Sequence, residues 1–314
     1  MAEDLAERLA GGELVIIDGG MGSQLQAEGV PMDHLAWSAR ANLDQPDVVQ
    51  RVHEAYIGAG AEVIIANTFA ASRAALEPAG LGGRVAEANR NAVRAAVAAR
   101  DAAATRPVAV AGSMSSFCPI AMDSDALGAR LSGPAAEDPR FPGPDDYQEQ
   151  AGLLAEAGAD LIVLEMIEAQ SYGRAAVQAA ADTGLPVWLG ISPARLDDGT
   201  VGTFPELGDG ESLDGLLSAL AGPALAAITV MHHDAEVTLD AIDVIRGHFA
   251  GPIGVYAETG GWQPPLWVFD GLTPAEYLSH ATTWAGHGAQ LIGGCCGTGP
   301  GHIQALSEGL ARRG

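Results

Sequence analysis

Short apolar runs rich in valine and isoleucine alternate with longer alanine-rich segments along the chain. The short runs have the length and composition of buried strands, and the longer segments repeat apolar residues at helical spacing. Strands are predicted over residues 14–18, 62–67, 108–113, 161–165, 187–192, 226–232, 253–258 and 290–293. The clearest helical patterns cover residues 84–104, 144–157, 171–182, 235–249, 274–286 and 300–312. Three of them are expected to begin near Pro144, Pro274 and Pro300, because a first helical turn does not need the missing proline N–H.

Eight alternating strand and helix units predict an α/β fold, a closed (β/α)₈ TIM barrel. An open doubly wound sheet usually has fewer strands and often starts with a glycine-rich dinucleotide-binding turn. No linker or longer internal repeat is visible, so residues 1–314 are expected to form one domain. Residues 118–143 and 193–211 are rich in Gly, Pro and Asp, and we interpret them as loops over the barrel mouth.

Composition narrows the range of functions. The chain has 16 basic and 40 acidic residues and a formal net charge of −24, which repels nucleic-acid backbones and anionic lipid surfaces, so neither is an expected partner. The chain lacks lysine, which excludes Schiff-base chemistry and the phosphate-binding P-loop. With three cysteines, no secretory signal and no apolar run of membrane-spanning length, the cytoplasm is the expected compartment.

Polar residues end almost every predicted strand. In a barrel, the side chains that carry chemistry lie at the carboxyl ends of the strands. These positions hold Asp18, Asn67, Thr68, Ser113, Glu165, Ser192, His232, His233, Glu258, Cys295 and Cys296. We expect these side chains to face one cavity.

The run LIGGCCGTGP places two adjacent thiols, Cys295 and Cys296, in a glycine-rich turn. Two such thiols can bind one soft metal ion such as Zn²⁺, although small buried residues or a vicinal disulfide are alternatives. A catalytic zinc usually has three protein ligands. His232 is the preferred third ligand and His233 the alternative, because strand alternation aims the two in opposite directions. Cys118 is interpreted as a structural thiol.

Two carboxylates, Asp18 in DGGMGSQL and Glu165 in LIVLEMIE, end the first and fourth predicted strands. Carboxylates at separate strand ends can hold a ligand's ammonium group, and general acid–base work is the competing use.

Several aromatic residues lie in or beside the predicted mouth loops. They are Trp37, Tyr256, Trp262 and Trp267. Their ring faces can receive an onium cation, although for each residue taken singly a role as a loop anchor is the preferred interpretation.

The segments DGGMGSQL, HEAYIGAGAEVIIANTF, LIVLEMI and GAQLIGGCCGTGPGHIQAL occur in this order over nearly the whole chain. Together they resemble the homocysteine S-methyltransferase family. The resemblance implies a (β/α)₈ barrel in which three cysteines hold a catalytic zinc and the homocysteine sulfur becomes its fourth ligand. It also implies that Cys295 and Cys296 are zinc ligands and that Asp18 and Glu165 lie near the substrate amine.

The chain departs from this family pattern at two strand ends. At the sixth strand, His232 stands where the family has its third cysteine, so the predicted zinc ligands are His232, Cys295 and Cys296. After the seventh strand, the family's Tyr-x-Asn-x-Gly run becomes Tyr-Ala-Glu-Thr-Gly, which introduces Glu258. Asn67 and Glu258 are predicted to bind substrate together with the two carboxylates of the first and fourth strands.

The sequence thus predicts a zinc-dependent S-methyltransferase that makes methionine or an analogue from homocysteine or a related thiol. Because the chain ends soon after the eighth strand, no cobalamin or folate module is expected. The predicted methyl donor is a small sulfonium or quaternary ammonium compound such as S-methylmethionine, S-adenosylmethionine or a betaine. Two alternatives stay open: a metal-dependent hydrolase or lyase built around His232 and Glu258, and a non-catalytic binder of a sulfur amino acid. The sequence gives no prediction of oligomeric state.

Overall fold

Eight parallel strands close into a barrel in the structure, a computed structural model that describes residues 2–33, 35–117, 141–204, 210–233, 235–263, 266–268 and 271–310. Their order in the sheet is β1-β12-β9-β8-β5-β4-β3-β2. The barrel closes between the first two strands, where Ile17 bridges Val63 in parallel and the N–H of Asp18 donates to the carbonyl of Val63 at 2.9 Å. The predicted (β/α)₈ fold is confirmed.

Each barrel strand overlaps one of the eight predicted segments; several strands are shorter than predicted, β3 ends two residues later and β8 begins one residue earlier. They are β1 (Val15–Ile16), β2 (Val63–Ile65), β3 (Ala109–Ser115), β4 (Leu161–Glu165), β5 (Val187–Ile191), β8 (Leu225–Met231), β9 (Ile253–Tyr256) and β12 (Leu291–Ile292).

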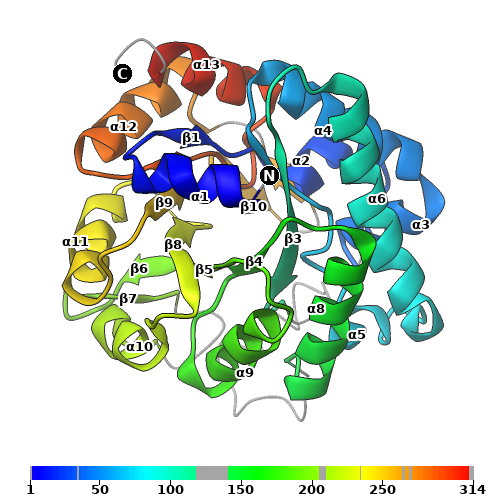
Figure 1. Cartoon of the computed structure of the whole chain (residues 1–314), viewed down its shortest axis with the longest axis horizontal. Coiled ribbons are helices and arrows are strands. Elements are labelled where there is room, and N and C mark those ends of the chain that lie inside the picture. The colour runs from blue at the N-terminus through cyan, green and yellow to red at the C-terminus, as the bar shows by residue number, and fades with distance from the viewer. Residues whose placement is uncertain are drawn as a thin grey trace.

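Most of the helices surround the barrel on its outer side (Figure 1). The described helices are α1 (Ala2–Ala10), α2 (Met21–Ala27), α3 (Ala41–Asp44), α4 (Pro46–Ala59), α5 (Arg73–Leu76), α6 (Val85–Ala103), α8 (Pro144–Ala157), α9 (Gln170–Ala181), α10 (Leu213–Leu220), α11 (Thr238–His248), α12 (Pro274–Gly286) and α13 (Pro300–Leu310), with short 3₁₀ turns η1 (Ser38–Arg40) and η2 (Gly82–Arg84). The six helices predicted most clearly agree with the structure to within a few residues. Pro144, Pro274 and Pro300 begin α8, α12 and α13, as expected.

Apolar side chains fill the inside of the barrel, so the barrel is a packed core rather than a pore. This inner cluster includes Val15, Val163 and Trp188 from the strands, and Leu5 and Leu9 from α1 pack against it. Helix α1 lies across one end of the barrel (Figure 1). Because α1 leads directly into β1, it covers the amino-terminal end, and the opposite end is the one available for chemistry.

Two short antiparallel hairpins interrupt the barrel pattern. Residues 193–211, interpreted from the sequence as a loop, contain β6 (Pro193–Arg195) paired with β7 (Val201–Thr203). The Asp198–Gly199 pair between these strands, with Gly199 at φ 83°, is typical of a β-hairpin turn. The interpretation of this segment as a loop, made from its composition, missed the hairpin. A second hairpin, β10 (Gly261–Gln263) with β11 (Leu266–Val268), follows the seventh barrel strand.

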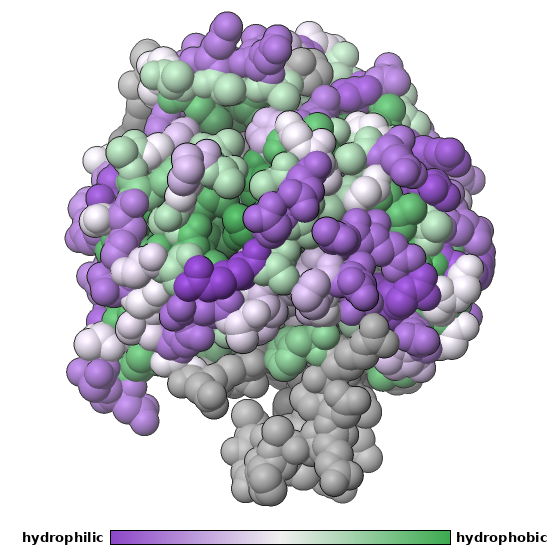
Figure 2. Space-filling model, turned by 60° about the horizontal axis from the view of Figure 1, so that its bottom comes forward, coloured by the Kyte–Doolittle hydropathy of each residue, from purple (hydrophilic) through white to green (hydrophobic). Residues whose placement is uncertain are grey.

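Within the described residues, no helix combines the length and the apolar character needed to cross a bilayer. Figure 2 shows hydrophilic residues on the protruding parts of one face and apolar residues mainly between them.

Candidate active site

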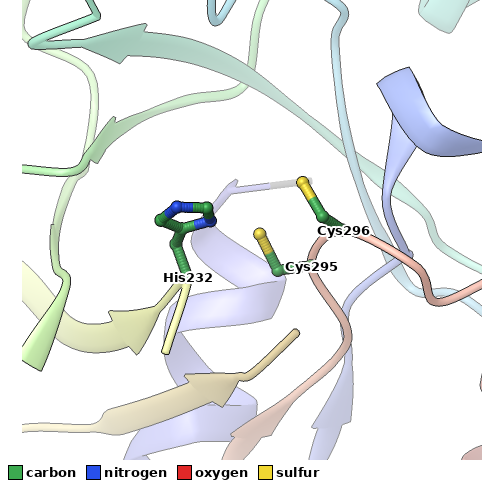
Figure 3. A group of neighbouring side chains, drawn as sticks. All are labelled: His232, Cys295 and Cys296. Atoms are coloured by element: carbon green, nitrogen blue, oxygen red, sulfur yellow. The ribbon is translucent and has the colours of Figure 1, made fainter. Parts of the chain in front are cut away.

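The three predicted metal ligands come together at the carboxyl end of the barrel. His232 follows β8, and Cys295 and Cys296 lie in the turn after β12. One ring nitrogen of the histidine and the two sulfurs all lie within 4.8 Å of one another, and Figure 3 shows the ring and the sulfurs approaching from separate elements. A tetrahedral site with bonds of about 2.0–2.3 Å needs ligand atoms about 3.5 Å apart, so small side-chain movements would complete it.

The structure distinguishes the two adjacent histidines. His232 has a left-handed backbone with φ 49°, and its Nδ1 lies 2.8 Å from Oε2 of Glu258. Its ring also packs edge-on against Phe204, with centroids 5.9 Å apart. His233 is buried and its Nε2 lies 2.8 Å from Oγ1 of Thr238. Of the two, His232 is therefore the one placed beside the cysteines.

Two buried tyrosines hold the turn that carries the cysteines. The hydroxyl of Tyr56, on α4, donates to the carbonyl of Thr298 at 3.0 Å. The hydroxyl of Tyr277, on α12, contacts the carbonyls of Gly293 at 2.7 Å and Ala257 at 3.0 Å. These bonds fix both sides of the turn to the helices behind it.

Glycine is required inside this turn. Gly297 has φ 81°, and a Cβ at this position would lie 1.8 Å from the carbonyl oxygen of Thr259. The Thr259 N–H in turn donates to the carbonyl of Cys296 at 2.8 Å. The close approach of these two segments explains the GGCCGTG sequence and fixes the direction of the thiols.

The donor set suits a soft divalent cation. The adjacent Cys296 sulfur, together with burial, raises the pKa of the Cys295 thiol well above its ordinary value. Burial lowers the pKa of His232, but the Cys295 sulfur and the Glu258 carboxylate together raise it well above its ordinary value. Two neighbouring thiols resist ionisation unless a positive charge lies between them, and two sulfurs with one imidazole form a known zinc ligand set. The residues present therefore fit such an ion.

Asp18 and Glu165 form a buried acidic pair beneath the same mouth. The N–H of Ile65 donates to Oδ2 of Asp18 at 2.9 Å, and Ser113 Oγ donates to Oε2 of Glu165. Burial raises the pKa of Glu165 to about 7, against the hydroxyls of Ser113 and Tyr256, which lower it. Burial also raises the pKa of Asp18 well above its ordinary range, opposed by the Ile65 N–H and reinforced by the charge of Glu165.

No arginine pairs with either of these two carboxylates in the part of the chain that the structure describes. A cationic ligand would therefore stabilise their ionised forms. Ser113 was noted at a strand end but was not among the predicted site residues. Its position at the end of the third predicted strand is the signal that points to it.

The two remaining predicted substrate residues have protein partners. The Asn67 amide donates to the carbonyl of Ser38 and to Oδ1 of Asn42, and its Oδ1 accepts from Ser38 Oγ, at 2.8–2.9 Å. Asn67 thereby ties the end of β2 to the η1–α3 segment. Oε2 of Glu258 faces the imidazole of His232. Their predicted contacts with substrate stay predictions.

An aromatic cluster lies beside the barrel mouth. Trp37 meets Phe69 edge-on at 5.9 Å between centroids, and Phe69 meets Phe117 at 5.4 Å. Phe69 and Cys295 both pack against the cluster inside the barrel, which places them at the same end of the molecule. Trp37 was predicted from the sequence, whereas Phe69 and Phe117 were missed, although Phe69 follows the second strand in the segment ANTF. Cys118 and the side chains of Trp262 and Trp267 lie outside the described residues.

Comparisons with known proteins agree with this geometry. The family model described as homocysteine S-methyltransferase matches residues 15–310. A homocysteine S-methyltransferase from Zea mays is 32% identical over 99% of this chain and 98% of its own length. One from Escherichia coli (strain K12) is 26% identical over 94% of both chains. The crystal structure of the homocysteine methyltransferase MmuM from Escherichia coli in its metallated form superposes with a TM-score of 0.72 at 25% identity, covering 94% of this chain and 96% of that one.

Proposed function

The chain belongs to the homocysteine S-methyltransferase family and is an enzyme, and from this premise we propose that it is a zinc-dependent enzyme that transfers a methyl group from a small onium donor to homocysteine. The observation that carries the proposal is the gathering of His232, Cys295 and Cys296 within 4.8 Å above a buried acidic pair. Methyl transfer accounts for both halves of the site, since one half suits a thiol and the other suits an amino group.

The acceptor amino acid would bind through its ammonium group to Asp18 and Glu165. Both carboxylates are buried, at 1% and 6% exposure, so ion pairs with a ligand there are screened little by water. Ser113 orients Glu165 through its hydroxyl. Binding a cation lowers the pKa of each carboxyl, so acceptor binding and ionisation of the pair support one another.

Zn²⁺ held by His232, Cys295 and Cys296 would supply the positive charge that keeps the acceptor thiol deprotonated at neutral pH. The residues determine where the thiol lies, because the ammonium is fixed at the acidic pair and the sulfur is left facing the cysteine turn. In the transfer itself the acceptor sulfur attacks the methyl carbon. A new S–CH₃ bond forms, the donor's bond to that methyl breaks, and its electron pair stays with the donor, which leaves as a neutral sulfide or amine.

The donor would be a sulfonium or quaternary ammonium compound, supported by the aromatic cluster of Trp37, Phe69 and Phe117. Aromatic faces attract a cation through the ring quadrupole. The net charge of −24 also favours approach of a cation over that of a phosphate-bearing donor. We further propose that residues 1–314 act as one cytoplasmic domain in methionine formation.

The direct test is zinc content and methyl transfer measured on the same preparations. Protein purified without chelator is expected to contain about one zinc per chain. It should convert homocysteine to methionine with S-methylmethionine, S-adenosylmethionine or a betaine. Cys295→Ser is expected to lose both zinc and activity. Cys118→Ser, which removes the third cysteine of the chain, is the matched control and should keep both.

Two outcomes would overturn the proposal. A protein that takes up no zinc under any loading condition would remove thiol activation by a metal. Consumption of the thiol without any methyl donor would favour a hydrolase or lyase at the same site.

A further inference from the structure

Glu258 lies at the end of β9, directly opposite His232 at the end of β8. Its Oε2 is 2.8 Å from Nδ1 of the imidazole. The two strand ends are also joined through the backbone, because the N–H of Glu258 donates to the carbonyl of His233 at 3.3 Å. This hydrogen bond ties the segment just after β9, which carries Glu258, to the end of β8.

The charge of Glu258 has few other partners. Oε2 is buried and has no hydrogen-bond partner within the described residues, so the imidazole nitrogen 2.8 Å away is its close polar contact there. In the same part of the chain, no arginine forms an ion pair with Glu258. Both side chains of the pair are mostly shielded, with exposures of 24% for His232 and 20% for Glu258. The carboxylate is thus directed at the imidazole.

A histidine that binds a metal uses one ring nitrogen for the ion and donates from the other. A carboxylate that accepts this second N–H fixes the tautomer, holds the ring plane and makes the imidazole a more basic ligand. The charges at the site support the same role for Glu258. Two thiolates and a neutral imidazole bring two negative charges to a divalent ion, and a nearby carboxylate adds a third without occupying a coordination position.

The left-handed backbone of His232 needs contacts from outside the residue to hold it. Its φ of 49° lies in the left-handed region, which costs a non-glycine residue energy and persists where surrounding contacts hold it. The His232 ring has two such contacts, one with Glu258 and one with Phe204.

We propose that Glu258 is a positioning residue of the metal centre, whose carboxylate orients the His232 ring and adds negative charge beside Cys295 and Cys296. The inference rests on the proposed metal site. It gives Glu258 a different role from the substrate contact predicted from the sequence.

The test compares Glu258→Gln with the parent by zinc affinity, measured in competition with a chelator, and by the visible spectrum of the cobalt-substituted protein. Glutamine keeps the size of the side chain and removes its charge. Zinc affinity is expected to fall about 10–100-fold, and the cobalt bands are expected to shift as the ring loses its fixed orientation. Glu258→Asp, which keeps the charge on a shorter arm, should recover part of the affinity.

Asp243→Asn is the matched control. Asp243 Oδ1 lies 2.8 Å from Nε2 of His287, the same separation, but this pair is on the surface, with exposures of 67% and 42%. Its loss should leave zinc affinity and the cobalt spectrum unchanged.

The outcomes separate this inference from the proposed function. If the parent binds zinc and Glu258→Gln binds it equally well with the same cobalt spectrum, the positioning role is wrong and the proposed function stands. If Glu258→Gln raises only the KM for homocysteine, at unchanged zinc affinity, Glu258 instead contacts the substrate, as predicted from the sequence. If the parent takes up no zinc, both proposals fall together.

Discussion

His232 and His233 are consecutive residues, yet their rings enter different parts of the molecule. Nδ1 of His232 lies 2.8 Å from Oε2 of Glu258 beside the cysteine turn, whereas Nε2 of His233 lies 2.8 Å from Oγ1 of Thr238 at the start of α11. The left-handed backbone at His232 turns the chain between the two. One residue is therefore available to a metal ion, and the other joins strand β8 to the next helix.

The two alanine variants should separate these roles. His232→Ala is expected to lose bound zinc and methyl transfer while keeping most of its stability. His233→Ala should keep zinc and lose about 1–3 kcal/mol of stability, because Thr238 Oγ1 is left buried without its partner. Zinc analysis and urea unfolding check both. Loss of zinc in His233→Ala but not in His232→Ala would show that His233, and not His232, is the ligand.

Acceptor binding should depend on pH through Glu165. Its pKa of about 7 in the folded protein lies above the ordinary value of 4.5. The ligand-free enzyme therefore holds this proton more tightly than the unfolded chain, and the stability due to it is lost as pH rises from about 4.5 through 7. Ammonium binding needs the ionised form of Glu165, so the affinity for the acceptor should rise as the pH increases through about 7.

Norleucine, which has an ammonium group and no thiol, isolates this effect. Between pH 6 and pH 8 the ionised fraction of a group with a pKa near 7 rises about tenfold, and norleucine affinity should rise by a similar factor. Calorimetric titration of the parent and of Glu165→Gln checks this. An equally steep rise in the variant would show that another group controls the binding.

Asp18→Asn is expected to weaken acceptor binding more than zinc binding. The amide keeps the shape of the side chain but cannot offset an ammonium charge, and loss of one buried charge partner costs about 2–4 kcal/mol of binding. KM for homocysteine and zinc content are measured together. Unchanged KM would remove Asp18 from the acceptor site.

Tyr277→Phe should loosen the cysteine turn. Its hydroxyl contacts the carbonyls of Gly293 and Ala257, and removing it leaves buried acceptors without that donor, at a cost of about 1–3 kcal/mol. Tyr147→Phe is the control, because its buried hydroxyl has no hydrogen-bond partner among the described residues; its stability should change by less than about 1 kcal/mol. Urea unfolding and zinc affinity are measured for both. Equal losses in the two variants would contradict a specific role for Tyr277.

Phe69→Leu should weaken binding of a cationic donor. Leucine keeps apolar bulk but has no ring face, so KM for the donor is expected to rise about 2–30-fold, corresponding to about 0.5–2 kcal/mol, while KM for homocysteine changes little. Phe249→Leu, at the end of α11, is the control. A rise in the homocysteine KM alone would place the aromatic cluster at the acceptor.

The sequence predicts the barrel well because its signals are local and repeated. Valine-rich strand runs and helix-starting prolines need no knowledge of tertiary contacts, and the rule that strand ends carry chemistry brings Cys295 and Cys296 to the same mouth as His232. Contacts between distant segments are a different matter. No sequence pattern shows that Ser113 donates to Glu165, or that Asn67 is bonded to Ser38 and Asn42. Such partners are set by register between neighbouring strands and by the loops that fold over them.

The pairing of β1 with β12 has a consequence for how the enzyme is made. The N–H of Gly20, shortly after β1, donates to Thr298 in the cysteine turn, so two segments far apart in the sequence meet at the proposed metal site. Strand β1 cannot pair with β12 until the residues between them have been synthesised. Under the proposed function, binding of the metal ion would therefore come after the synthesis of β12, and a shortage of that ion would leave the active site as the incomplete part of the fold.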